Sequence, residues 1–258
     1  MSVFSRITGV TVGVGPTHEM LAPLAALCFT ANTGLPVRIL GAKEFARSGV
    51  SHPAALRFQL FDYTDADTAI YFDADWFCVQ SWQPWRYANH AAFIACRDFV
   101  LESEWPHQKY DYSSTAFHGD EISETIACDE PLREDYITAI RHFSQIKRTP
   151  KRWINSGLFI ATREPHETLF RRANELYETT VGHHADYYEQ PALNKALEDT
   201  DIKLGFLSRK HNVLAAYEHR WPHSIVGLHV KIKRHEEFVG KVKSGEIADA
   251  DAVRRHFF

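Results

Sequence analysis

The sequence predicts an α/β fold with a mostly parallel central sheet flanked by helices. Residues 7–40 have the pattern of strand, helix and strand, and such a β-α-β unit places its two strands in parallel with a right-handed crossover. Residues 69–72 have the pattern of a third, apolar strand, and acidic residues follow it directly. In open α/β sheets, ligands bind at the carboxyl ends of the strands.

The first β-α-β unit is indicated by composition and by its end signals. Residues 7–14 are rich in β-branched residues and end in a glycine-containing loop, as expected of a strand. Apolar residues at helical spacing follow over 20–30, with Thr17 as the expected N-cap and Asn32-Thr33-Gly34 as the helix end. Residues 36–40 supply the second strand.

The loop after the first strand contains Gly13-Val14-Gly15, but it lacks a dinucleotide-binding fingerprint. His18 stands where that fingerprint has its third glycine, and no acid ends the second strand at Leu40. We therefore expect neither a nicotinamide nor a flavin cofactor. The glycine-containing loop can still lie against a nucleotide.

A helix is predicted over 51–61, just before the strand at 69–72. Ser51 is the expected N-cap, and Pro53 lies in the first turn, where a proline loses no helical hydrogen bond. Arg57 lies on this helix, so we expect it to bring a fixed positive charge toward the following strand end.

Asp73-Ala74-Asp75 is the most informative motif, because it follows the apolar strand directly. Side chains at i and i+2 point the same way in an extended chain, so Asp73 and Asp75 are expected to face one spot. Two carboxylates between apolar residues are costly to bury without a cation, and oxygen ligands suit Mg²⁺ or Mn²⁺. The alternative is a structural pair that caps a helix or forms salt bridges.

A second D-x-D motif, Asp65-Ala66-Asp67, shows that this spacing alone is not specific. Its neighbours Tyr63, Thr64 and Thr68 are typical of a polar turn before a strand. We therefore expect a structural role for it and reserve the ligand-binding role for the motif at the strand end.

The rest of the chain continues the alternation of strands and helices around one long loop. The predicted elements are a strand over 91–96 that ends in Asp98, a loop over 101–130, a helix over 131–147, a strand entered through Asn155-Ser156-Gly157, a helix over about 166–179, a helix that opens at 187–194 with Pro191 in its first turn, and strands over 202–207 and 225–230. Gly157 is expected to let a ligand or another backbone approach closely.

Composition sets the broad class. The chain has 258 residues, 45% of them apolar, which fits one domain with a proper core. A formal charge of −4 does not suggest a nucleic-acid partner. The four cysteines show no C-x-x-C pair, so we expect inert core thiols in a reducing compartment. No signal peptide or long apolar run is apparent, so we expect a soluble or peripherally attached protein in the cytoplasm.

The order of these motifs resembles that of nucleotide-sugar transferases with the GT-A fold, in particular the retaining glycosyltransferases of family 8. The resemblance runs from about Ile7 to about His229. The segments that carry it are Ala69–Asp75, Trp82–Trp85, Ala95–Asp98, Ile154–Leu158, Glu189–Asn194, and His229 with the lysines after it. They are similar, in that order, to the family's YLDAD, DLxELW, strand-end sugar-binding aspartate, FNSGV, DQDALN and H-x-x-G-x-x-K.

The resemblance implies a metal-dependent glycosyltransferase that moves a sugar from a nucleotide-diphospho-sugar, expected to be a UDP-sugar, with retention of configuration. The implied metal ligands are Asp73, Asp75 and His229, and a mixed oxygen and imidazole set favours Mn²⁺ over Mg²⁺. The implied catalytic residues are Glu189, Gln190 and Asp98. The implied donor-binding residues are Val12, Gly13, Val14, Arg57, Asp73, Ala74, Asp75, Asp98, Asn155, Ser156, Lys231 and Lys233.

The same resemblance implies one catalytic domain over 1–230, with a Rossmann-like nucleotide-binding half over about 1–98 and an acceptor half over about 99–230. The acceptor is expected to be a glycan, a glycolipid or a protein. Residues 231–258 are expected to be a basic tail, which is either a solvated end or, through Phe257 and Phe258, lies on anionic lipid at the inner membrane face.

Three departures from the family pattern keep alternatives open. The first is Glu189, which is one methylene longer than the family's aspartate. The second is the missing glycine after His229, so that neither Lys231 nor Lys233 has the family's spacing, and the third is a tail that is basic and short. Either lysine is therefore a candidate for the phosphate contact. A non-catalytic nucleotide-sugar-binding relative is the main alternative, followed by a D-x-D phosphatase or a nucleotidyltransferase.

Overall fold

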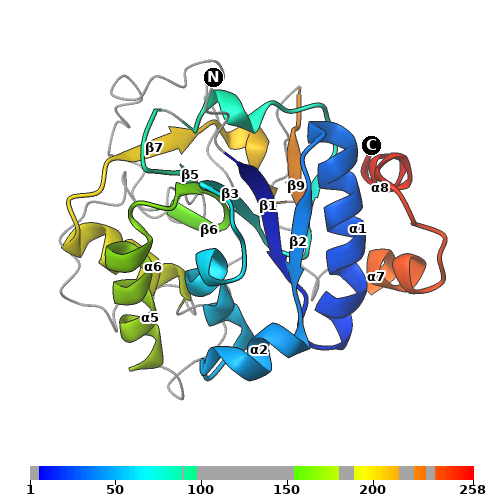
Figure 1. The fold of residues 1–258 in the computed structure, drawn as a ribbon. Coiled ribbons are helices and arrows are strands. Elements are labelled where there is room, and N and C mark those ends of the chain that lie inside the picture. Colours follow the sequence, from blue (N-terminus) through cyan, green and yellow to red (C-terminus); the bar gives the residue numbers. More distant parts are fainter. Residues whose placement is uncertain (1–5, 89, 98–153, 180–188, 215–223, 231–235) are drawn as a thin grey trace, which may run out of the picture.

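The computed structural model describes residues 6–88, 90–97, 154–179, 189–214, 224–230 and 236–258 (Figure 1). The described elements before residue 98 are β1 (Ile7–Val12), α1 (Pro16–Thr33), β2 (Val37–Leu40), α2 (Ala42–Ser48), the 3₁₀ helix η1 (Pro53–Asp62), β3 (Thr68–Phe72), β4 (Trp76–Cys78), the 3₁₀ helix η2 (Pro84–Arg86) and β5 (Phe93–Arg97). Those after residue 153 are β6 (Ile154–Thr162), the π-helical turn η5 (His166–Phe170), α5 (Arg171–Glu178), α6 (Glu189–Asp199), β7 (Leu204–Leu207), the 3₁₀ turn η6 (Arg209–His211), β8 (Val213–Leu214), β9 (Gly227–His229), α7 (Glu236–Lys243) and α8 (Ala250–Phe257). The predicted loop over 101–130 and the predicted helix over 131–147 lie outside the described residues.

The described central sheet has six strands in the order β2-β1-β3-β6-β5-β7. β1 is parallel to β2 and to β3, and β5 is parallel to β7. Only β6 runs against its neighbours β3 and β5. The predicted class, a mostly parallel sheet flanked by helices, is confirmed. A smaller sheet with the order β4-β9-β8 stands beside it.

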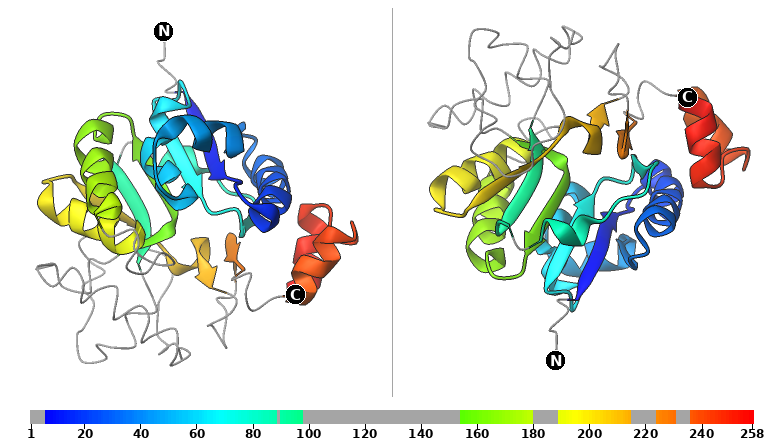
Figure 2. Two further views of the ribbon diagram at one scale, coloured as in Figure 1. Left: turned by 90° about the horizontal axis from the view of Figure 1, so that it is seen from below. Right: turned by 90° about the horizontal axis from the view of Figure 1, so that it is seen from above.

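The core lies on both faces of the central sheet, because successive side chains of a strand point to opposite faces. On β3, Tyr71 joins the cluster under η1, α5 and α6, whereas Phe72 joins the cluster under α1, the smaller sheet and the C-terminal helices. The ring of Tyr71 stacks on Phe159 with centroids 4.8 Å apart, and the ring of Phe72 stacks on Phe29 with centroids 4.7 Å apart. Figure 2 shows the helices on the two faces of the sheet from two further sides.

The ends of the first two helical segments differ in detail from the sequence prediction. Helix α1 begins at Pro16 with Gly15 as its N-cap, not Thr17, and the φ of 89° at Gly15 favours glycine. The predicted stop at Gly34 is confirmed, with a left-handed φ of 72°. The N-cap of η1 is His52, not Ser51, because Nδ1 of His52 accepts the Ala54 N–H at 3.2 Å.

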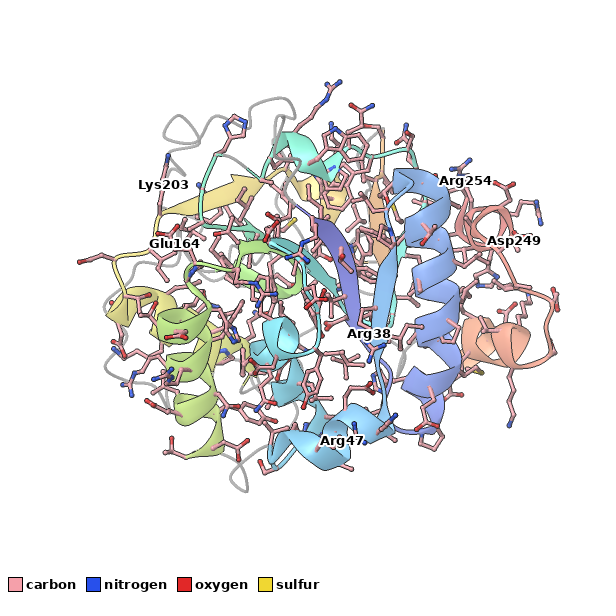
Figure 3. The ribbon with its side chains drawn as sticks, viewed as in Figure 1. Arg38, Arg47, Glu164, Lys203, Asp249 and Arg254 are labelled. Carbon is pink, nitrogen blue, oxygen red and sulfur yellow. The ribbon has the colours of Figure 1, made fainter. Side chains whose placement is uncertain are left out.

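The basic C-terminal segment is folded over its described part. Phe238 on α7 and Val253 on α8 are buried in the cluster that includes α1. Asp249, labelled in Figure 3, caps α8 by accepting the Ala252 N–H at 2.7 Å. The Phe257 ring lies 5.2 Å from that of Phe238, so of the expected lipid-facing pair only Phe258 is strongly exposed, at 62%.

Two structural expectations are met by the described residues. Cys28, Cys78 and Cys96 are buried, whereas Cys128 lies outside the described residues. Asp67 of the second D-x-D accepts the Arg6 N–H at 3.0 Å, as expected of a structural turn. Among the described residues, no helix is both long and apolar enough to cross a membrane.

Candidate functional site

Asp73 and Asp75 lie in the tight turn that joins β3 to β4. The Trp76 N–H donates to the Asp73 carbonyl at 2.9 Å and closes the turn, while the Asp73 N–H donates to the carbonyl of Gly157 on β6 at 2.9 Å. Ala74, between the two acids, is buried. The carboxylates therefore converge as predicted, but a turn brings them together rather than the extended strand that the i, i+2 argument assumed.

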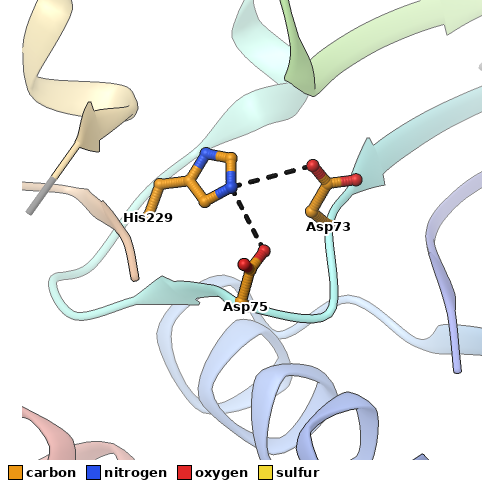
Figure 4. A group of neighbouring side chains, drawn as sticks. All are labelled: Asp73, Asp75 and His229. Carbon is orange, nitrogen blue, oxygen red and sulfur yellow. Dashed lines mark ion pairs between the residues drawn. The ribbon is translucent and has the colours of Figure 1, made fainter. Parts of the chain in front are cut away.

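The register of the smaller sheet brings His229 to the same turn. β4 pairs antiparallel with β9, and Trp76 stands opposite His229. Asp75 immediately precedes Trp76, and its carbonyl accepts the Val230 N–H at 2.8 Å. As Figure 4 shows, the imidazole Nε2 faces both carboxylates, at 3.1 Å from Asp75 Oδ1 and 3.7 Å from Asp73 Oδ2.

These three side chains have the chemistry of a metal centre. Their possible ligand atoms all lie within 4.8 Å of one another. His229 is 1% exposed, and its Nε2 makes no hydrogen bond to any described residue. Carboxylate oxygens with one imidazole nitrogen are a donor set suited to a divalent transition ion. The residues predicted as metal ligands therefore fit such an ion.

One carboxylate oxygen of Asp73, Oδ1, has two partners. Oδ1 accepts the Tyr71 hydroxyl at 2.7 Å and lies 3.0 Å from Nη2 of Arg57. Burial by itself would lower the pKa of Arg57, but Asp73 and the other acidic groups around the guanidinium together outweigh burial, and the pKa is raised overall. Burial also raises the pKa of Tyr71 well above its ordinary value, so the phenol keeps its proton and remains a donor. With Oδ1 held in this way, Oδ2 is left facing His229.

Arg57 also ties the turn to the start of β6. Its Nη1 donates to the Ser156 carbonyl at 3.2 Å and to Ser156 Oγ at 3.1 Å, and its Nε donates to the Ala54 carbonyl at 3.0 Å. A contact from Arg57 to a bound donor stays a prediction.

Side-chain amides join the start of β6 to the start of α6. Gln190 Oε1 accepts the Ser156 N–H at 2.8 Å. Asn194 brackets Ile154, accepting its N–H at 2.8 Å and donating to its carbonyl at 2.9 Å. Glu189, the first residue of α6, is close enough to add to the raised pKa values of Arg57 and Tyr71. The structure thus brings Gln190 and Glu189 to the edge of the sheet that carries Asp73.

The Asn155-Ser156-Gly157 segment lies against the imidazole of His229. Asn155 Oδ1 accepts the Gly157 N–H at 2.9 Å and an Nδ2–H of Asn212 at 2.8 Å. A Cβ at Gly157 would lie 2.4 Å from Cε1 of His229. The close approach expected at this glycine is therefore made by an imidazole ring.

The glycine-containing loop after β1 shares the same sheet edge. Val10 is opposite Tyr71, so β1 and β3 run side by side toward their carboxyl ends. Val12 and Gly13 are buried and Val14 is half-buried. A Cβ at Gly13 would lie 2.8 Å from Ala22 Cβ, so packing of α1 is one reason for this glycine. Contacts from this loop to a nucleotide stay predictions.

The remaining candidates lie outside the described residues: Asp98, Lys231 and Lys233. Sequence reasoning gave no role to Tyr71, Asn194 or Asn212, which contact Asp73, Ile154 and Asn155. Tyr71 carried a usable signal, because it lies two residues before Asp73 on an apolar strand and would need a partner for its buried hydroxyl. Asn212 carried none, because its place depends on a contact across 57 residues.

A cavity of about 560 Å³ lies away from this group, between η1 and the η5–α5 segment. Its lining combines Phe58 and Phe170 with charges of both signs, including Glu164, labelled in Figure 3. None of the lining residues belongs to the Asp73, Asp75 and His229 group.

No known family model matches the sequence, and neither does any curated protein. Solved structures are similar in fold. The galactosyltransferase LgtC, solved in complex with donor and acceptor sugar analogues, is 13% identical with a TM-score of 0.50, over 92% of this chain and 95% of its own. The bifunctional glycosyltransferase WbbM is 13% identical with a TM-score of 0.53, over 90% of this chain and 46% of its own.

The glycosyltransferase GlyE of Streptococcus pneumoniae TIGR4 is 12% identical with a TM-score of 0.54, over 97% of this chain and 62% of its own. This chain thus spans less than two thirds of WbbM and of GlyE, but nearly the whole of LgtC. At these identities the likeness is one of fold, and this chain has the α/β architecture of the GT-A glycosyltransferases.

Proposed function

We propose that this chain is a metal-dependent glycosyltransferase that transfers a sugar from a UDP-sugar to an acceptor with retention of configuration. The observation that carries the proposal is the meeting of Asp73, Asp75 and His229 at the carboxyl edge of a GT-A sheet. A divalent ion held there would have positions open to diphosphate oxygens. The acceptor class that the family resemblance supports is a glycan, a glycolipid or a protein.

The charge requirements of the reaction support this assignment. Breaking the anomeric C–O bond leaves negative charge on the nucleoside diphosphate and positive charge on the sugar ring. A bound divalent ion, Mn²⁺ by preference of the mixed donor set, would supply positive charge beside the leaving diphosphate. The residues around Asp73 orient its carboxylate. Arg57 and Tyr71 bind Oδ1, and this leaves Oδ2 facing His229.

Roles for the remaining residues follow the resemblance and the geometry together. We assign Glu189 and Gln190 to electrostatic support of the developing sugar cation, since the negative charge of Glu189 is close to the Asp73 turn. Asp98 and Asn155 are proposed to hold hydroxyls of the donor sugar. Lys231 or Lys233 is proposed to contact the diphosphate.

The test measures binding and turnover separately. UDP-, GDP- and CDP-sugars are added to the protein with and without Mn²⁺, and thermal stability is followed together with release of the nucleoside diphosphate. UDP-sugars are expected to stabilise the protein only with Mn²⁺, and UDP is expected to be released. Metal-dependent UDP binding without turnover would favour the non-catalytic alternative, and the absence of any metal-dependent binding would reject the metal-site assignment.

A matched pair of variants connects the result to the site. Asp75→Asn is expected to abolish the Mn²⁺-dependent stabilisation and turnover while the protein stays folded. Asp65→Asn is the control, because Asp65 belongs to the other D-x-D motif and is exposed. Equal losses in both variants would count against the role of Asp75.

A further inference from the structure

We propose that Asn212 is a positioning residue that fixes the tautomer of His229, so that the lone pair of Nε2 faces Asp73 and Asp75. The inference rests on the proposed function only in its consequence, which is metal affinity. Its geometric part is a chain of three hydrogen bonds that runs from a backbone N–H of β6 through two buried asparagines to the imidazole.

The first link fixes the orientation of Asn155. A backbone N–H can only donate, so the Asn155 atom that faces the Gly157 N–H at 2.9 Å must be the amide oxygen. That same oxygen is the atom that faces Asn212 at 2.8 Å. Both asparagines are buried, at 7% and 1% exposure, so water does not compete freely for these bonds.

The second link transfers this constraint to the imidazole. Because Asn155 presents an oxygen, Asn212 must turn its NH₂ group toward Asn155 and its own oxygen toward His229. That oxygen lies 3.2 Å from Nδ1 of His229. Nδ1 must therefore carry a proton, and in the neutral ring Nε2 is left with its lone pair.

In the opposite tautomer two acceptors would meet within this chain of buried amides, where no cation can separate them. In the tautomer proposed here the acceptors that meet are Nε2 and Asp75 Oδ1, 3.1 Å apart, and a cation bound between them would satisfy both. With the proton on Nε2, the lone pairs of Nδ1 and Asn212 Oδ1 would face each other at 3.2 Å. Rotating the Asn212 amide would only move the conflict to Asn155 Oδ1, which the Gly157 N–H holds in place. A buried acceptor left without a donor is unfavourable, because it has given up its hydrogen bonds to water and gains none in the protein.

The consequence concerns the metal group. Asp75 Oδ1, 3.1 Å from Nε2, is itself a good acceptor and would draw a proton onto that nitrogen if nothing held the proton at Nδ1. A proton on Nε2 would occupy the position that a ligand lone pair needs. Asn212 thus pre-sets His229 for coordination, in the way that partners of the second ring nitrogen commonly orient metal-binding histidines.

The tautomer can be read directly by NMR of protein labelled with nitrogen-15 histidine, without metal and at mildly alkaline pH. The His229 signals are assigned by their loss in His229→Gln. Wild type is expected to show a protonated Nδ1 and a bare Nε2. Asn212→Leu is expected to move the proton to Nε2, because Asp75 then becomes the favoured acceptor.

Two further variants separate positioning from stability. Asn212→Asp keeps an acceptor for Nδ1 but sets a carboxylate against Asn155 Oδ1, so it is expected to keep the tautomer while losing stability. Asn32→Leu is the control for a lost asparagine elsewhere, because Asn32 donates to the carbonyls of Cys28 and Cys78 and not to His229. It is expected to leave the tautomer unchanged.

Mn²⁺ affinity, measured by electron paramagnetic resonance, tests the consequence. Asn212→Leu is expected to bind Mn²⁺ about 10- to 100-fold more weakly than wild type, and Asn212→Asp less than tenfold more weakly. A wild-type Nε2–H tautomer, or an Asn212→Leu protein with unchanged tautomer and affinity, would overturn the inference. A wild type with the Nδ1–H tautomer that binds no Mn²⁺ would reject the proposed function and leave the tautomer assignment standing.

Discussion

Gly157 and His229 are in contact as close as a glycine allows: a Cβ on Gly157 would lie 2.4 Å from Cε1 and 2.8 Å from Nδ1 of the imidazole. Real Cβ atoms do not approach other atoms so closely, so any side chain at this position would displace the ring. The backbone of β6 therefore packs directly against the imidazole of His229 and limits where the ring can lie.

Gly157→Ala is expected to displace His229 and to weaken Mn²⁺ binding at least tenfold, with a loss of about 1–3 kcal/mol of stability from overpacking. Urea unfolding and Mn²⁺ titration measure the two effects. Gly240→Ala is the control, because a Cβ at that helical position meets nothing within 4 Å. Alanine there is expected to stabilise α7 by about 0.5–1 kcal/mol. Wild-type Mn²⁺ affinity in Gly157→Ala would contradict the placement of the imidazole.

The ion pair of Arg57 and Asp73 gives a second prediction. Arg57 is buried, and it binds both Asp73 and Ser156. Arg57→Met would leave the Asp73 carboxylate without its cation, which costs about 3–5 kcal/mol for a buried pair. The loss is expected in urea unfolding of the metal-free protein.

The surface pair of Arg38 and Glu44 is the matched control for this loss. Its arginine is 49% exposed, so Arg38→Met is expected to cost less than about 1 kcal/mol. Similar losses of stability in Arg57→Met and Arg38→Met would show that burial does not determine how much the Arg57–Asp73 pair contributes to the free energy of unfolding.

Most of the fold follows from local patterns in the sequence. The strands β1, β2 and β3 and the helix α1 were predicted within a few residues, because their apolar runs, glycines and caps are all local signals. The reversed direction of β6 was not predicted, because the segment before it carries no local signal of strand direction. Helix α2 and the C-terminal helices α7 and α8 were missed, since they are short and polar. Helix α2 has no buried residue, whereas α7 and α8 are held by packing on the domain.

The residues of the candidate site differ in how far the sequence alone could predict them. Asp73 and Asp75 stand at a strand end, and that position is visible in the sequence. His229 lies 154 residues after Asp75 in the chain and was named only through the family resemblance, although the register of β4 with β9 is what places it. Asn212 could not be predicted, because an asparagine in a loop has the same appearance whether it faces solvent or a buried amide.

The C-terminal helices give a third prediction, which concerns stability. Val253 is fully buried in the cluster shared with α1, and Arg254 donates from Nε to the Val79 carbonyl at 2.9 Å. Val253→Asp is expected to cost at least about 3 kcal/mol, because it buries an unpaired charge. Thermal unfolding measures the loss, and Arg255→Asp, at an exposed position on the same helix, is expected to change stability by less than about 1 kcal/mol.

This prediction also bears on the two expectations for the basic tail. If residues after 243 are part of the folded domain, their deletion is expected to lower thermal stability in the absence of any lipid. A truncated protein with wild-type stability would contradict this packing and would support the expectation of a solvated tail. Binding to anionic liposomes that depends on Phe258 and Arg255, in a protein of unchanged stability, would support lipid contact.

The buried thiol of Cys28 predicts how stability depends on alkaline pH. Burial, followed by the negative charge of Asp249, raises the pKa of Cys28 from an ordinary value near 9.0 to about 12. The native state therefore holds this proton more tightly than the unfolded chain does. The stability from this group is fully present below about pH 9, where both states are protonated, and is lost as the pH rises toward about 12.

The expected size follows from the linkage relation. A difference of about three pKa units corresponds to a loss on the order of 4 kcal/mol across that interval. Cys28→Ala removes the ionising thiol from both states, so its stability is expected to fall less steeply with pH than that of wild type. It starts lower at neutral pH, by about 1 kcal/mol, because a buried atom has been removed.

Urea unfolding of wild type and Cys28→Ala at a series of pH values isolates this contribution, because the other titrating groups, Tyr71 among them, are common to both proteins. The two stability curves should approach each other as the pH rises from neutral, and they should cross if the thiol contributes as much as its burial implies. Curves that stay parallel over the whole range would mean that Cys28 ionises as readily in the folded protein as in the unfolded chain. The packing of α1 on the sheet would then be looser than its buried face indicates.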